Sequence, residues 1–209
     1  MLFHRVICAT LLLAGVGTSA FAQDASARKF QFMAGFGYTL GGDTIVPITL
    51  TPENGDGKSY HEDLSGGAGL DLRLGMQMRL SDKMRLQAMA AYHNDQANGI
   101  HGHASFRRIP LELVAHWRTS ENWWLGVGVR QALNGMLDRQ AGFKSGDTPL
   151  PARKWEVSFS PALILEAEYM MSPNWGLKMR GVKEHGKFKE FEEKFNADHV
   201  GAMVLYYFD

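Results

Sequence analysis

The polar segment His101-Gly102-His103-Ala104-Ser105 contains residue types that could do chemistry. If this segment is extended, His103 and Ser105 lie on one face, because successive side chains of a strand point to opposite sides. The imidazole could then act as the base, and the hydroxyl as the nucleophile, of an ester hydrolysis. One hypothesis is therefore an acyl hydrolase that acts on lipid A or a phospholipid from the rim of a membrane protein.

The same histidines could instead bind a metal ion. His101 and His103 would supply two imidazole ligands, and His61, Glu62 or Asp63 from an earlier segment could complete the set. No spacing rule links the two segments, and polar loops that face water have this composition too. We therefore predict no catalytic centre, no bound metal and no cofactor, with the hydrolase kept as an alternative.

Composition excludes two other classes of protein. The 209 residues are 45% hydrophobic and 21% charged, and 22 Lys plus Arg balance 22 Asp plus Glu. A nucleic-acid partner is excluded, because phosphate neutralisation requires a surplus of cations. Mean hydropathy is -0.21, and no apolar run approaches twenty residues after the first 22. This pattern excludes a protein that crosses a membrane with helices.

The first 22 residues are typical of a cleaved signal peptide. His4 and Arg5 precede the apolar stretch 6–16, and Ala20-Phe21-Ala22 supplies the small residues of a cleavage site. We predict a signal peptide over residues 1–22 and a single domain over residues 23–209. Removal of Cys8 with the signal leaves an exported chain that must fold without a disulfide.

Alternation with a period of two runs through the mature chain, with large apolar residues at one parity and many Gly, Ser and charged residues at the other. Between Ala68 and Leu80, for example, every even position is apolar, and the odd positions include Asp71, Arg73 and Arg79. Period two indicates strands and not helices. The alternation occurs in eight segments, at residues 30–40, 68–80, 84–93, 108–117, 123–130, 155–169, 175–180 and 199–208.

The connections between these segments alternate in length. Short links such as Ser81-Asp82 and Met171-Ser172-Pro173-Asn174 have tight-turn compositions, whereas the links 41–66 and 133–154 are long. Short turns at one end, long loops at the other and an even strand number are typical of a transmembrane barrel. We predict an all-β fold, an eight-stranded antiparallel up-and-down transmembrane β-barrel with short periplasmic turns and long extracellular loops.

Two features favour lipid over water as the solvent of the apolar face. A soluble barrel would place that face inside. Aromatic residues such as Trp117, Trp123 and Trp175 instead cluster where the apolar face meets the turns, as expected at a membrane interface. The segments also match the length of a tilted membrane crossing. The charged face therefore lines the lumen of the predicted barrel.

The lumen is predicted to hold an interlocked network of charged side chains that plugs it. Buried charges persist only when they are paired and hydrogen-bonded. The alternative is a narrow channel for a small solute. The predicted members are Asp71, Arg73, Arg79, Arg85, Arg108, Glu112, Arg130, Glu156, Glu166, Glu168, Lys178 and Arg180.

Residues 29–208 resemble the small eight-stranded outer-membrane β-barrel proteins of Gram-negative bacteria, of the OmpA/OmpX type. The resemblance rests on the strand pattern, on turns such as Ser172-Pro173-Asn174-Trp175 and on the closing strand that ends at Phe208. Family members end on the aromatic residue itself, whereas Asp209 follows it here. The resemblance implies the cell outer membrane, contact with its lipid including lipopolysaccharide, the barrel-assembly machinery during biogenesis and a monomer. The long loops of this protein would then serve the structure of the cell envelope or interaction at the cell surface, without catalysis.

Overall fold

The computed structural model describes residues 30–46, 49–50, 60–61, 63–99, 102–140, 144–145, 148–149 and 151–208. The predicted signal peptide, Glu62, His101 and Asp209 lie outside these ranges. Within the described ranges, no helix combines the length and the apolar character that a membrane crossing requires.

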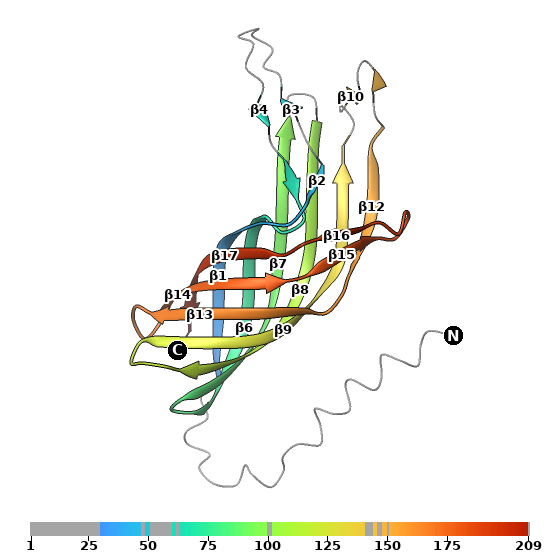
Figure 1. The fold of residues 1–209 in the computed structure, drawn as a ribbon. Helices are drawn as coiled ribbons and strands as arrows, with labels where there is room; N and C mark the ends of the chain where they lie inside the picture. The colour runs from blue at the N-terminus through green and yellow to red at the C-terminus, as the bar shows by residue number, and fades with distance from the viewer. Residues whose placement is uncertain are drawn as a thin grey trace, which may run out of the picture.

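Eight antiparallel strands form a closed barrel (Figure 1). They pair in chain order, β17 pairs with β1, and β9 pairs with β13 to complete the ring. Neighbours in sequence are neighbours in the sheet, which gives the predicted up-and-down topology. The barrel strands are β1 (Phe30–Leu40), β6 (Gly69–Ser81), β7 (Met84–Gly99), β8 (Gly102–Arg118), β9 (Trp123–Arg139), β13 (Ala162–Met170), β14 (Trp175–Lys183) and β17 (His199–Tyr207).

Additional strands lie at the long-loop end. There β7, β8 and β9 continue beyond the ring together with β12, and β15 and β16 form a hairpin beside them (Figure 1). Within the described ranges, three small two-stranded sheets pair β2 with β5, β3 with β4, and β10 with β11. These strands are β2 (Thr44–Val46), β3 (Thr49–Leu50), β4 (Tyr60–His61), β5 (Leu64–Ser65), β10 (Lys144–Ser145), β11 (Thr148–Pro149), β12 (Arg153–Phe159), β15 (His185–Phe188) and β16 (Lys194–Asn196).

The barrel is inverted relative to a soluble protein. In β6, Asp71 and Arg73 are buried, whereas Leu72 and Leu74 are 45% and 68% exposed. Alternation of this kind places these charged side chains in the lumen and these leucines on the outside. The predicted orientation of the two faces is therefore confirmed.

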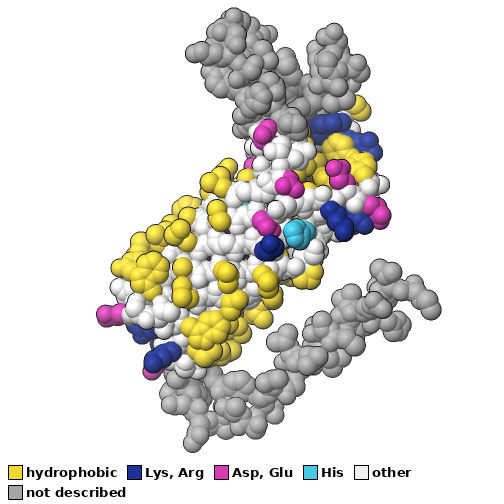
Figure 2. Space-filling view, in the orientation of Figure 1, with side chains coloured by type: hydrophobic (Ala, Val, Ile, Leu, Met, Phe, Trp, Pro, Cys, Tyr) yellow, Lys and Arg dark blue, Asp and Glu magenta, His cyan; other side chains and the backbone are white. Residues whose placement is uncertain are grey.

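A belt of exposed apolar side chains surrounds the ring. Leu40, Leu70 and Leu163 are among the residues at its long-loop edge, and Phe30 and Trp175 are among those at its short-turn edge. Figure 2 shows hydrophobic side chains over the wall and charged side chains gathered toward the two ends. A strand of about ten residues, tilted by about 45°, crosses the hydrocarbon core of a bilayer.

Aromatic pairs lie at the short-turn edge of this belt. The rings of Trp123 and Tyr169 are 5.2 Å apart between centroids, and those of Trp175 and Tyr206 are 5.0 Å apart. Tyr206 in turn contacts Phe208 at 4.9 Å. Rings with one polar end are favoured at a membrane interface, so these contacts mark one boundary of the bilayer.

The sixth predicted strand differs from the structure. Residues 155–169 do not form one continuous strand, because β12 ends at Phe159 and β13 begins at Ala162, after Ser160 and Pro161. Proline has no backbone N–H to donate to a neighbouring strand. The predicted outward direction of Val157 and Phe159 is wrong, because both side chains are buried.

A bulge in β9 accounts for the change of face. Asn134 has a φ of 52°, and the register between β8 and β9 shifts at this point. One extra residue inverts which side chains point inward on the bulged strand. Ala132 is buried before the bulge and Leu137 after it, so the inward positions change from even to odd. A pattern with one constant period of two predicts a single inward parity for the whole strand, so it could not predict this inversion.

Candidate functional site

The centre of the lumen is Glu112 on β8, whose carboxylate binds three arginines. Its oxygens lie 3.1 Å from Nη1 of Arg73, 3.3 Å from Nη1 of Arg130 and 3.0 Å from Nη2 of Arg180. All four side chains are buried. The arginines come from β6, β9 and β14, so these ion pairs connect opposite walls of the barrel.

Toward the short-turn end, Lys178 binds two carboxylates. Its Nζ lies 2.7 Å from Glu166 and 3.4 Å from Glu168. Glu168 also lies 2.9 Å from Arg85, whose guanidinium stacks 4.3 Å from the ring centroid of Trp124. The Lys178–Glu166 contact is a charge-assisted hydrogen bond, a class that is stronger than neutral hydrogen bonds.

Toward the long-loop end, Glu184 binds two further arginines. Its carboxylate lies 3.0 Å from Arg108 and 3.1 Å from Arg130, and it directly follows β14. Asp71 binds Arg73 at 2.8 Å. The ion pairs therefore form one continuous network along the lumen. Six cations (Arg73, Arg85, Arg108, Arg130, Lys178 and Arg180) face five carboxylates (Asp71, Glu112, Glu166, Glu168 and Glu184), and 6 minus 5 leaves +1.

The structure brings together ten of the twelve predicted lumen residues, and the placement of the other two is corrected. Arg79 is exposed near the end of β6. Glu156 is exposed as well, and it pairs with Lys189 at 2.6 Å, because the inversion of faces turns its side chain out of the lumen. The ten buried residues are Asp71, Arg73, Arg85, Arg108, Glu112, Arg130, Glu166, Glu168, Lys178 and Arg180.

Several lumen residues were absent from the prediction. Glu184 is the most important of them, and extending the alternation of Lys178 and Arg180 by four residues would have found it. His116 lies 3.1 Å from Glu166, and the hydroxyl of Tyr207 donates to Glu168. These polar side chains occupy inward positions of recognised strands, but a search restricted to Asp, Glu, Lys and Arg omits them.

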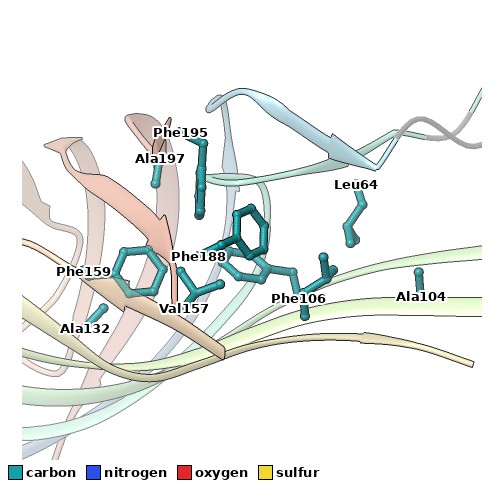
Figure 3. Packing of buried hydrophobic residues seen from close by; sticks show 10 residues of the cluster. Leu64, Ala104, Phe106, Ala132, Val157, Phe159, Phe188, Phe195 and Ala197 are labelled. Atoms are coloured by element: carbon teal, nitrogen blue, oxygen red, sulfur yellow. The ribbon is translucent and has the colours of Figure 1, made fainter. Parts of the chain in front are cut away.

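An aromatic cap lies over the long-loop end of the network. Its rings are Phe106 on β8, Phe159 on β12, Phe188 on β15 and Phe195 on β16, and they converge in Figure 3. The Phe195 ring lies 6.0 Å from Phe106, 6.3 Å from Phe159 and 5.3 Å from Phe188, between centroids. The guanidinium of Arg108 lies 5.1 Å from the Phe159 ring, so the cap rests directly on the charged network.

The hydrolase hypothesis concerns His103 and Ser105, which the structure places on the projecting part of β8. Both are partly buried, and their side chains alternate with buried Ala104 and Phe106. Residues two apart on a strand are separated by roughly 7 Å. Asp138 is the cross-strand neighbour of Ser105, but its carboxylate binds Lys154 at 3.2 Å. The residue types are adjacent on one face of β8, and the carboxylate opposite Ser105 is occupied by Lys154.

The metal hypothesis lies partly outside the described residues, because these include neither His101 nor Glu62. Among the residues that the structure does describe, no group of three or more His, Cys, Asp or Glu side chains could hold a metal ion.

Several basic side chains lie above the belt, at the long-loop end. Lys187 pairs with Glu192 at 3.0 Å, and Lys189 pairs with Glu156. The hydrogen bonds from these lysines lower the pKa of the Glu192 and Glu156 carboxyls. Both pairs are exposed, so solvent screens them and they contribute little to stability. Lys183, at the end of β14, is exposed as well.

No family model and no curated protein sequence matches the chain. Solved structures with a similar fold include Ail of Yersinia pestis in complex with the heparin analogue sucrose octasulfate (12% identity, 86% of this chain and 97% of that chain, TM-score 0.49). Neisserial surface protein A has 11% identity over 87% and 99% of the two chains, with a TM-score of 0.46. Outer membrane protein AlkL has 16% identity over 90% and 94%, with a TM-score of 0.39.

The barrel itself establishes the class of protein. A closed eight-stranded ring with charges inside, an apolar belt outside and aromatic residues at the belt edge is the architecture of small outer-membrane barrels. The predicted fold class, the OmpA/OmpX-type recognition and the location in the cell outer membrane are confirmed.

Proposed function

We propose that this outer-membrane barrel is a non-conducting anchor whose strands beyond the bilayer serve surface interaction. The observation that supports a non-conducting barrel is the continuous ion-pair network under the aromatic cap. A channel requires a polar path in which water and solute can exchange. Here the inward charges bind one another across the lumen, so a passing ion would have to displace these ion pairs.

The proposed surface interaction rests on the strands that extend beyond the ring. A membrane crossing needs about ten residues, yet β8 and β9 each contain 17. The bulge at Asn134 and the break at Ser160 and Pro161 lie where these strands leave the belt. Residues beyond that level add nothing to membrane residence, so a role outside the cell accounts for them.

Planar-bilayer recordings of the purified full chain test the plug. We expect no large, stable conductance from the wild-type protein. The matched variants are Glu112→Gln in the network and Glu156→Gln outside it. Conductance from Glu112→Gln alone would support the plug, whereas a stable open pore of nanosiemens scale in the wild type would contradict it.

The surface role needs a separate test. Replacing residues 95–106 with a two-residue turn removes the projecting hairpin of β7 and β8 and retains the ring below it. We expect this variant to assemble, as judged by heat-modifiable gel migration. Attachment of expressing cells to cultured host cells should then fall to the level of cells without the protein. Equal attachment by the wild type and the shortened variant would refute the role of this hairpin.

A further inference from the structure

The lipid-facing wall is hollowed over four adjacent strands, β13, β14, β17 and β1. Two adjoining hollows of about 680 Å³ and about 580 Å³ share Leu40, Leu165, Gly181 and Val200 in their linings. Figure 2 presents this wall to the viewer, with white backbone open between hydrophobic side chains. The hollow lies within the apolar belt, where acyl chains are its solvent.

The sheet register explains the depth of the hollow. Gly181 pairs with Leu165 on one side and Val200 on the other, and Val200 pairs with Leu40. One outward row of the sheet therefore has a glycine among three large side chains. In the next row toward the short-turn end, Ala202 lies between Met179 and Tyr38. Small residues form the floor, and large residues form the sides.

Packing of the barrel does not require a glycine at position 181. A Cβ added at Gly37 would meet the side chain and backbone of Met203, and one added at Gly75 would come within 2.7 Å of the Met89 side chain. A Cβ added at Gly181 would meet nothing within 4 Å. Glycine inside a strand is destabilising relative to alanine. The open space above the backbone is therefore the feature that distinguishes this position.

A cation lies at the outer edge of the same hollow. Lys183 lines it, two residues after Gly181 on the same face of β14 and next to Leu163 in the sheet. Asp198 also lines this edge, but one of its carboxylate oxygens accepts a hydrogen bond from the backbone N–H of Glu184 at 2.7 Å. Among the described residues, no carboxylate lies within 4.0 Å of the Lys183 ammonium in an ion pair.

We propose that this hollow binds lipopolysaccharide, with an acyl chain over Gly181 and a lipid A phosphate at Lys183. An apolar hollow with a cation at its long-loop end matches a lipid of the outer leaflet, whose phosphate lies at the interface and whose chains extend inward. A lipid bound in this orientation buries the floor of the hollow and neutralises the lysine. A second copy of the chain would bring an identical lysine to the same contact.

Native mass spectrometry of the purified full chain, titrated with diphosphorylated lipid A, tests the proposal. The wild type should retain one lipid A molecule. Gly181→Leu fills the hollow and should weaken retention about tenfold, as expected when two buried methylene contacts are lost. Lys183→Gln should weaken it about fivefold, the effect of one lysine at an anionic lipid surface. The Lys183→Gln effect should vanish with dephosphorylated lipid A.

Matched controls lie on other parts of the molecule. Ala90→Leu places the same leucine side chain at an exposed small residue on β7, and Lys83→Gln removes an exposed cation at the short-turn end. Both should retain lipid A as the wild type does, and heat-modifiable migration verifies that every variant is folded. The proposal is overturned if folded Gly181→Leu retains lipid A unchanged. It is also overturned if phosphatidylethanolamine binds as tightly as lipid A. A mass spectrum that shows a dimer of the chain without bound lipid A would overturn it too.

Discussion

Replacing Glu112 by glutamine should strongly destabilise the barrel. The substitution keeps the size of the side chain and removes one negative charge from a carboxylate that binds Arg73, Arg130 and Arg180. All three guanidiniums stay buried. The network then has six cations against four carboxylates, so its formal charge rises from +1 to +2.

The expected loss follows from the burial of the group. Removing one partner of a buried ion pair costs about 3–5 kcal/mol, because the remaining charge is left in a medium of low polarity. Arg130 keeps Glu184, Arg180 keeps Glu166 and Arg73 keeps Asp71, so each arginine retains one partner. Because each arginine keeps a partner, we expect a loss of unfolding free energy in the lower half of that range.

Urea unfolding of the protein reconstituted in lipid vesicles, followed by tryptophan fluorescence, measures the effect. With an m-value of about 3 kcal/mol/M, a loss of about 3 kcal/mol shifts the midpoint by about 1 M. The matched control is Glu156→Gln, which removes the same charge from an exposed pair and should leave the midpoint unchanged.

Equal midpoints for the two variants would refute the reasoning, because burial is the difference between them. A shift of the Glu156→Gln midpoint by the same amount would mean that this glutamate also lies in the lumen. That result would restore the uniform alternation of residues 155–169 and contradict the bulge in β9.

Gly37→Ala should prevent normal closure, because its Cβ would collide with β17, whereas Gly181→Ala should assemble; migration of unboiled samples on gels separates the two results. Phe195→Ala should lower the free energy of unfolding by about 3 kcal/mol, since it removes the ring that contacts the other three rings of the cap. Urea titration measures this change, and an unchanged midpoint would show that the cap does not contribute to stability. Ser105→Ala should leave the mass of lipid A incubated with the protein identical to that seen with the wild type. Loss of an acyl chain with the wild type alone would restore the hydrolase hypothesis.

The alternation of residues was sufficient to predict the ring. A period of two specifies on which face of the strand each side chain lies. The charged face then identifies the lumen, and the apolar face identifies the side that contacts lipid. The register is regular around Arg73 in β6 and around Lys178 in β14, so both residues were assigned to the correct side. The position of Glu112 between three arginines depends on the register between distant strands, and alternation along one strand does not contain that information.

The predictions failed where the backbone departs from ideal strand geometry. The positive φ of Asn134 inverts the inward face of β9, and Pro161 interrupts the sixth strand, so Glu156 and Phe159 were both assigned to the wrong side. Asparagine tolerates this conformation, but many asparagines do not adopt it. The aromatic cap was missed for the same reason, because Phe159 was expected to face lipid.

The network has a consequence for biogenesis, because its members come from strands made early and late. Arg85 on β7 binds Glu168 on β13, and Glu112 on β8 binds Arg180 on β14. The polypeptide emerges from β1 to β17, yet its first and last strands must meet before the lumen exists. An unfinished sheet would expose its cations without their partners. Completion of the barrel should therefore be cooperative, with little population of half-closed intermediates.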